Sequence, residues 1–221
     1  MIRQFFNKKP TPEYPKYWLD YEALFATTKR SELHNTRFVV LDTETTGFDY
    51  EKDRVLCIGA VDVFNNEINV ANAFEVYIKQ EHFNENTVEI HGIIKNERIE
   101  TTTEEDALKL FLNYIGNSIL VAHHARFDIT MINKMLLRHN LPKLKNSVLD
   151  TVNLYRATRI KSNLIKQDKY TLDEIAENYV LDVSDRHTAA GDALLTAIIF
   201  LKTTTILKNN KGLTLKKMFK L

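Results

Sequence analysis

Two acidic residues follow directly on a run of apolar residues in the stretch Phe38–Gly47, whose sequence is FVVLDTETTG. The apolar run is rich in β-branched residues and predicts a strand buried on both faces. Asp42 and Glu44 are two positions apart, so both side chains leave the same face of such a strand and can converge on one cation. Mg²⁺ and Mn²⁺ prefer oxygen ligands of this kind. The stretch therefore indicates a metal site, and two ordinary acids at a solvated strand end are the alternative.

Two later segments carry groups that could complete the site. The sequence HHARFD ends at Asp128, which should lie at the start of a helix after a strand, close to where ligands bind in α/β sheets. The sequence RHTAAGDA, residues 186–193, contains His187 and Asp192. Five helical steps rotate by about 140°, so we expect His187 on the loop before the helix that carries Asp192. Taken singly, Asp128 could interact with the helix dipole and His187 could lie on the surface.

In their order and spacing, the three segments resemble the three motifs of the DEDDh 3'–5' exonucleases. The matching stretches are D-x-E-T-T-G at 42–47, H-x-A-R-F-D at 123–128 and R-H-T-A-x-G-D-A at 186–193. The likeness extends over roughly residues 37–206 and is closest to the proofreading epsilon subunits of bacterial replicative DNA polymerases. Three motifs in the family's order are far more specific than any one of them.

This resemblance implies an RNase H-like α/β fold, with a five-stranded mixed sheet in the order 3-2-1-4-5 flanked by helices and with strand two antiparallel to the others. It also implies two Mg²⁺ or Mn²⁺ ions per site, bound by the carboxylates of Asp42, Glu44, Asp128 and Asp192. His187 would be the general base. Candidate contacts to the substrate are Thr43, Thr45, His91, His124 and Phe127. His124 departs from the family pattern, which usually has asparagine at this position.

The chemistry of phosphodiester hydrolysis makes the same demands. The reaction needs an in-line water, neutralisation of charge on the transition state and stabilisation of the departing 3'-oxygen. Two divalent ions about 3.5–4 Å apart can supply these, and holding them so close requires several carboxylates. Asp42 is the natural bridging ligand, and Glu44 would help to hold the ion that activates the water. Histidine exchanges a proton near neutral pH, which suits His187 to accept the proton of that water.

The elements that must position these residues follow from hydrophobic periodicity. Strands are predicted at 38–41, 54–63, 67–78, 118–123 and 148–150, the first three as a meander. Helices are predicted at 17–29, behind the capping boxes Thr102–Glu105 and Thr171–Glu174, from about 127 to 141, and around Leu194–Leu201. The basic segment Arg156–Lys166 is expected to be a loop. Hairpin strands followed by alternating helices and strands predict one mixed sheet flanked by helices.

The composition fits one globular domain with two appendages. The chain has 221 residues, of which 44% are hydrophobic and 27% are charged, both ordinary values for a soluble protein. We expect an N-terminal extension at 1–35, an exonuclease domain at 36–207 and a basic tail at 208–221. The net charge of +1 means that any nucleic-acid site must be local. The single cysteine, Cys57, excludes a disulfide framework and a zinc cluster.

The expected location and partners follow from the same features. The N-terminus lacks the apolar core of a signal peptide, and no stretch approaches eighteen uninterrupted apolar residues, so we expect a cytoplasmic protein with no membrane partner. The expected partners are single-stranded DNA or primer 3' ends, and a DNA polymerase or another replication protein. Two alternatives stay open: a 3'–5' RNA exonuclease resembling RNase T or oligoribonuclease, and a non-catalytic nucleic-acid-binding module on the same fold.

Overall fold

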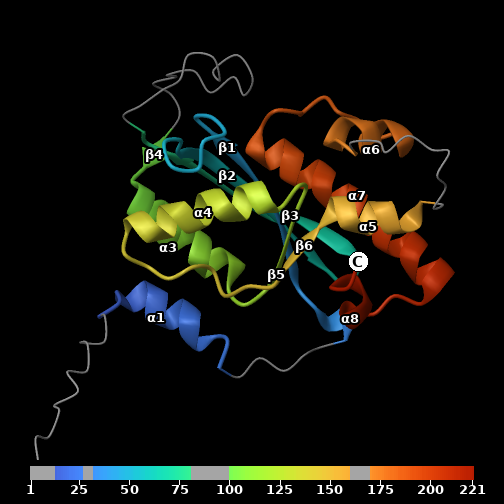
Figure 1. Cartoon of the computed structure of the whole chain (residues 1–221), viewed down its shortest axis with the longest axis horizontal. Coiled ribbons are helices and arrows are strands. Elements are labelled where there is room, and N and C mark those ends of the chain that lie inside the picture. The colour runs from blue at the N-terminus through green and yellow to red at the C-terminus, as the bar shows by residue number, and fades with distance from the viewer. Residues whose placement is uncertain (1–12, 27–31, 81–99, 160–169) are drawn as a thin grey trace, which may run out of the picture.

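The structure is a computed structural model that describes residues 13–26, 32–80, 100–159 and 170–221. Its centre is a six-stranded sheet in the order β4-β3-β2-β1-β5-β6 (Figure 1). The strands are β1 (Phe38–Thr45), β2 (Val55–Phe64), β3 (Glu67–Ile78), β4 (Thr101–Thr102), β5 (Ile119–Ala122) and β6 (Val148–Asp150). The three long strands are consecutive in the sequence, as the predicted meander requires.

The sheet has the expected RNase H-like order and one additional strand. β2 runs antiparallel to both β1 and β3, and β5 and β6 run parallel to β1. The predicted order 3-2-1-4-5 corresponds to β3-β2-β1-β5-β6 and is confirmed. The prediction of five strands is wrong, because Thr101 and Thr102 pair with Tyr77 and Ile78 as a sixth strand at the edge. Two residues are too few to give a periodic signal in the sequence.

Helices cover both faces of the sheet (Figure 1). They are α1 (Lys16–Ala23), α3 (Glu104–Ile115), α4 (Arg126–Arg138), α5 (Thr151–Thr158), α6 (Leu172–Asn178), α7 (Ala189–Lys211) and α8 (Leu215–Met218), with a 3₁₀ turn at Leu33–Asn35. Val39 and Leu41 of β1 pack with residues of α1, α3 and α4. Phe38 and Val40 pack with residues of α5, α7 and α8. The alternating side chains of β1 therefore separate two helical layers.

The position of β1 between these layers decides where its polar residues point. The strand is buried on both faces, as its sequence predicts. Phe38, Val40, Asp42 and Glu44 occupy every second position of β1. Asp42 and Glu44 therefore lie on the same face as Phe38 and Val40, which is the face toward α7. Thr43 lies on the opposite face, toward α4.

Gly59 in β2 lets the start of α7 approach the sheet. Gly59 is the register partner of Asp42, and a Cβ placed on it would lie 2.2 Å from the carbonyl carbon of Ala189. A larger residue fits only if the backbone shifts at that point. The close contact brings the first turn of α7, which carries Asp192, next to Asp42.

Two local predictions are wrong. The start of the segment Arg156–Lys166, expected to be a loop, is helical, because α5 runs on to Thr158; residues 160–169 lie outside the described residues. The Asp150 carboxylate caps α5 by accepting the backbone N–H of Val152 at 2.9 Å. The cap of α3 is Thr103 rather than Thr102, and its hydroxyl accepts the backbone N–H three residues on, at 3.1 Å. The capping box of Thr171 and Glu174 is confirmed.

The segments predicted as appendages pack on the sheet domain where the structure describes them. In α1, Trp18 and Tyr21 are buried, and the Tyr21 hydroxyl donates to Oδ1 of Asn146 at 2.6 Å. α7 continues to Lys211, past the predicted boundary at residue 207, and α8 buries Met218 against the sheet. The division of the chain into three parts stays a prediction.

Helix α7 is apolar over most of its length. Its segment Ala189–Asn210 contains a stretch of 18 residues with a mean hydropathy of 1.5 and is long and apolar enough to cross a membrane by length and composition. Half of that stretch is buried inside the protein, and Ala197, Phe200 and Leu207 pack in the same cluster as Val40 of β1. The helix therefore has the environment of a core helix.

Candidate active site

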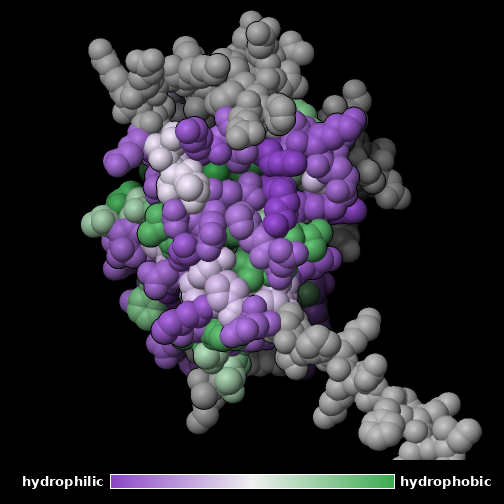
Figure 2. Space-filling model, turned by 90° about the vertical axis from the view of Figure 1, so that its left-hand side faces the viewer, coloured by the Kyte–Doolittle hydropathy of each residue, from purple (hydrophilic) through white to green (hydrophobic). Residues whose placement is uncertain are grey.

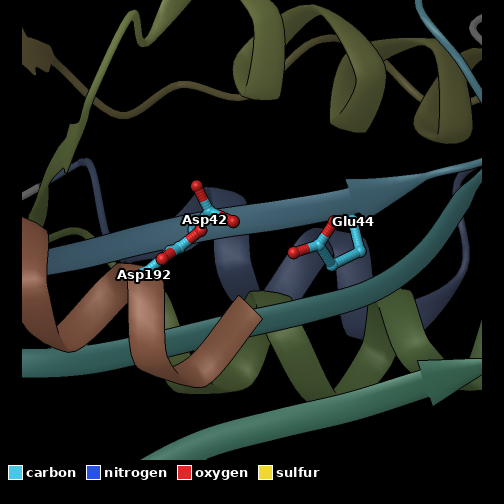
Figure 3. Close-up of side chains that lie close together, drawn as sticks. All are labelled: Asp42, Glu44 and Asp192. Atoms are coloured by element: carbon cyan, nitrogen blue, oxygen red, sulfur yellow. The ribbon is translucent and has the colours of Figure 1, made fainter. Parts of the chain in front are cut away.

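Three carboxylates from two distant segments meet near the end of β1. One oxygen from each of Asp42, Glu44 and Asp192 lies within 4.8 Å of the others. Asp42 and Glu44 stand on the same face of β1, and Asp192 comes from the first turn of α7 beside Asp42 (Figure 3). The structure thus brings together three of the four acids that the sequence marks as metal ligands.

Asp128, the fourth acid, is attached to β1 from the other helical layer. It lies in the first turn of α4 and is 4% exposed. Its Oδ1 accepts hydrogen bonds from the backbone N–H of Thr43 at 3.0 Å and from the Thr43 hydroxyl at 2.7 Å. Asp128 is not part of the three-carboxylate group, but its charge contributes to the raised pKa of Asp42.

The pKa values of these carboxyl groups reflect crowding in a buried site. Burial, followed by the charges of the neighbouring carboxylates, raises the pKa of Asp42 well above its usual range. Burial and the charge of Asp192 raise the pKa of Glu44 to about 7, and burial also raises the pKa of Asp128. The guanidinium of Arg186 opposes the shifts of Asp42 and Glu44. A bound divalent cation would relieve this repulsion.

Asp192 shows whether the site fits a metal ion. Its side chain is buried, and Oδ2 pairs with the Arg186 guanidinium. Its Oδ1 has no hydrogen-bond partner among the described residues. A buried anionic oxygen is costly unless something compensates its charge. Beside two further carboxylates, this oxygen fits a divalent cation that prefers oxygen ligands, such as Mg²⁺ or Mn²⁺.

His187 lies on the loop before α7, as expected, with a φ of 67° and an exposed side chain. The loop folds tightly over the start of the helix, because Thr188 caps α7 and a Cβ on Gly191 would lie 2.0 Å from the carbonyl oxygen of Asp185. The pKa of Asp173 is lowered by its hydrogen bond with Arg186 and, to a smaller extent, by the charge of His187. The structure does not bring His187 into the three-carboxylate group, and its role as general base stays a prediction.

His123 and His124 differ in their surroundings. His123 is half-buried between Thr151, whose hydroxyl lies 2.8 Å from Nδ1, and the carbonyl oxygen of Tyr170, which lies 2.9 Å from Nε2. Burial and the neighbouring His124 lower the pKa of His123 to about 4, so the ring is neutral and Nε2–H donates to the carbonyl. His124 is exposed, and its backbone N–H donates to Oδ1 of Asp150 at 3.2 Å. It is therefore the side chain of this pair that a substrate could reach.

The other predicted substrate contacts occupy varied positions. The hydroxyls of Thr43 and Thr45 are buried and donate within the chain, to Asp128 and to the carbonyl oxygen of Gly47 respectively. In this structure the two hydroxyls make hydrogen bonds within the protein, and contact of the two threonines with substrate stays a prediction. Phe127 is half-buried, and His91 lies outside the described residues.

Two features of the site were not assigned from the sequence. Phe48 is 76% exposed, and its ring centroid lies 5.7 Å from that of Phe127. Its place directly after the first motif is the signal that could have identified it. Arg186 belongs to the third motif. Its ion pairs with both Asp173 and Asp192 depend on how α6 packs on α7. A side chain's partners on another helix leave no pattern in the sequence.

The chain matches known nucleases and polymerase subunits over most of its length. A family model described as exonuclease, RNase_T, matches residues 39–200. DNA polymerase III subunit epsilon of Aquifex aeolicus is 36% identical over 174 residues, which are 78% of this chain and 83% of that protein. DNA polymerase III PolC-type of Thermotoga petrophila is 31% identical over 179 residues, which are 80% of this chain and 12% of that protein.

A solved structure shows the same fold. It is exonuclease X in complex with 5' overhanging duplex DNA, with a TM-score of 0.61 and 23% sequence identity. The match covers 82% of this chain and 96% of that one.

Proposed function

Because the chain belongs to the exonuclease family, we propose that it removes 5'-nucleoside monophosphates from the 3' end of single-stranded or frayed DNA. The observation that carries the proposal is the buried group of Asp42, Glu44 and Asp192, in which one oxygen of Asp192 has no partner in the described part of the chain. Exonucleases hydrolyse phosphodiesters, and a buried site rich in carboxylates suits hydrolysis assisted by two divalent ions.

The residues of the chain would act as follows. Asp42, Glu44 and Asp192 would hold Mg²⁺ or Mn²⁺ from the α7 face of β1, and Asp128 would hold it from the α4 side. When bound, such ions neutralise the charge that develops on the phosphate and lower the pKa of a bound water. His187 would accept a proton from the attacking water, and its exposed position on the loop would allow it to close over the site when a strand is present.

Phe48, four positions after Glu44, suggests how a strand end is held. Phe48 projects into solvent next to Phe127. Bases of single-stranded nucleic acid stack on aromatic side chains without sequence preference, each contributing roughly 1–3 kcal/mol. We propose that a base near the 3' end of the strand stacks on Phe48 in this way.

A role in DNA replication is supported by the similarity to a DNA polymerase III subunit epsilon. We accordingly propose DNA rather than RNA as substrate, and a DNA polymerase or another replication protein as partner in the cytoplasm. Copurification of a polymerase with the tagged full chain would test the partner, and recovery of the chain alone would contradict it.

The direct test of the proposed chemistry is metal dependence. Cleavage of a single-stranded DNA oligomer should be abolished by EDTA and restored by Mn²⁺ or Mg²⁺, but not by Ca²⁺. Calcium has longer and looser coordination, so it should bind the carboxylates without holding the reacting oxygens in line. Release of nucleotides, followed by chromatography, is the measurement. Undiminished cleavage in EDTA would contradict the proposed mechanism.

The same assay separates the alternatives when DNA and RNA oligomers of matched sequence are compared. Faster digestion of the RNA would favour an RNA exonuclease. Tight binding of the strand without cleavage, in every metal tested, would favour a non-catalytic binding module.

Gly59→Ala should damage the active site through the position of α7. The added methyl group would meet the backbone of Ala189, and overpacking of this kind costs about 1–3 kcal/mol in the free energy of unfolding. A displacement of α7 by about 1 Å should lower the cleavage rate by roughly 10²-fold. Denaturant unfolding and single-turnover cleavage measure the two effects.

Gly116→Ala is the control for this experiment. Gly116 ends α3 with a φ of 47°, so alanine strains the backbone there at a site outside α7 and β1. We expect this control to lose stability and keep its activity. Wild-type cleavage by Gly59→Ala would contradict the role of the close contact between β2 and α7.

A further inference from the structure

Arg186 joins two acidic residues on different helices. Its Nε and Nη2 donate to the two carboxylate oxygens of Asp173 in α6, at 2.6 and 3.1 Å. Its Nη1 pairs with Oδ2 of Asp192 in α7. Two parallel bonds to one carboxylate fix the plane and the direction of a guanidinium. Arg186 therefore reaches Asp192 with one nitrogen, while its other two nitrogens are held by Asp173.

This arrangement leaves one oxygen of Asp192 available. Oδ2 is taken by Arg186, whereas Oδ1 is buried and has no hydrogen-bond partner in the described part of the chain. Asp192 as a whole is 6% exposed and faces Asp42 (Figure 3). A guanidinium released from Asp173 would favour a two-pronged pair with Asp192, and that pair would occupy both oxygens.

We propose that Asp173 is a positioning residue, which holds Arg186 in a one-nitrogen contact with Asp192 and so keeps Oδ1 free for a divalent cation. The inference rests on the proposed function, because it needs a cation among Asp42, Glu44 and Asp192. Asp173 acts through Arg186 and not by contact with the cation or the substrate.

The surroundings of the three residues support a role at the site rather than in stability. The side chain of Asp173 is 62% exposed, and ion pairs with so exposed an acid contribute little to folding. Arg186 is much less exposed, at 15%, and pairs with both Asp173 and Asp192. The opposite side of the molecule, over α3 and α4, is mostly hydrophilic (Figure 2). The charge of Arg186 also opposes part of the rise in the pKa values of Asp42 and Glu44 that burial and the neighbouring carboxylates cause.

Binding of Mn²⁺ to the full chain, measured by isothermal titration calorimetry, tests the proposal in a double-mutant cycle. Asp173→Asn should weaken the affinity for Mn²⁺ by about 10-fold, because residues that orient metal ligands typically change metal affinity by 10–100-fold. The same substitution should have no effect in an Arg186→Met background, since no guanidinium is left to close on Asp192. At saturating Mn²⁺, Asp173→Asn should recover the kcat of the wild type.

A nearby acid provides the matched control. Asp185→Asn removes an exposed negative charge from the loop beside Arg186 and should leave Mn²⁺ affinity unchanged. Weaker binding in Asp185→Asn, or equal weakening by Asp173→Asn in both backgrounds, would show a general effect of charge and overturn the proposal. Thermal unfolding in EDTA verifies that each variant is folded, and Arg186→Gln replaces Arg186→Met if the latter does not fold.

The cycle also separates this proposal from the proposed function. A wild-type chain that bound no Mn²⁺ would contradict the function itself. Wild-type binding that is unchanged in Asp173→Asn would overturn only the role of Asp173.

Discussion

Asp42→Asn should abolish cleavage and leave the protein folded. Asp42 lies between Glu44 on its own strand and Asp192 on α7, and it is the proposed ligand shared by both ions. Asparagine keeps the size of the side chain but offers one neutral oxygen in place of a carboxylate. Single-turnover cleavage of DNA measures the loss. Asp20→Asn, an exposed acid of α1, is the control and should cleave like the wild type. Activity near wild type in Asp42→Asn would contradict the site.

The same substitution should weaken the pH dependence of stability in the metal-free protein. Burial, followed by the charges of the neighbouring carboxylates, raises the pKa of Glu44 from its ordinary 4.5 to about 7 and also raises that of Asp42. The stability gained from a raised pKa is fully present below the unfolded value and is lost as the pH rises through the folded value. The contribution of Glu44 to the melting temperature in EDTA should therefore fall between about pH 4.5 and 7. The lowered pKa of His123 acts in the opposite direction, but equally in the wild type and the variant. The melting temperature should fall less in Asp42→Asn, because one charge of the group is gone, and an equal fall would argue against repulsion among these acids.

His187→Ala should lower kcat by roughly 10²–10⁴-fold, the usual contribution of a positioned general base. Metal and DNA binding should change little, because His187 is exposed on the loop and outside the three-carboxylate group. A group of acids could form a metal site without any catalytic activity. The histidine, in contrast, has its proposed role only if it activates a water for hydrolysis. The rate of single-turnover cleavage at saturating enzyme is the measurement.

His139→Ala is the control for the histidine. His139 lies at the end of α4, 3.4 Å from a carboxylate oxygen of Glu104, and its loss should leave kcat unchanged. If His187→Ala kept the full wild-type rate, His187 would not be the base and the mechanism would need another proton acceptor.

The sequence was sufficient for the strands that carry the acids. The apolar run before Asp42 is buried on both faces, and the period of two along a strand places Glu44 on the same face as Asp42. The hairpin pattern predicted a mixed sheet flanked by helices. The order of its five longer strands came only from the resemblance to the exonuclease family. The loop position of His187 followed from helix geometry alone.

Other features depend on contacts that no local pattern encodes. β4 forms because two residues pair with the end of β3. α5 begins directly after its cap Asp150 and ends at Thr158, inside the start of the segment whose basic residues suggested a loop. The hydrogen bonds from Thr43 to Asp128 join β1 to α4 across the core. The bridge from Asp173 through Arg186 likewise depends on how α6 and α7 pack. Tertiary packing thus decides how the acids are held, whereas the sequence decides which acids are there.

Digestion of a DNA strand labelled at its 5' end, compared with a closed single-stranded circle, tests the central claim most directly. With Mn²⁺, the account predicts a ladder of labelled products that shorten from the 3' end, release of 5'-nucleoside monophosphates, and an intact circle. Early release of the label as a mononucleotide, or cutting of the circle, would contradict a 3'–5' exonuclease.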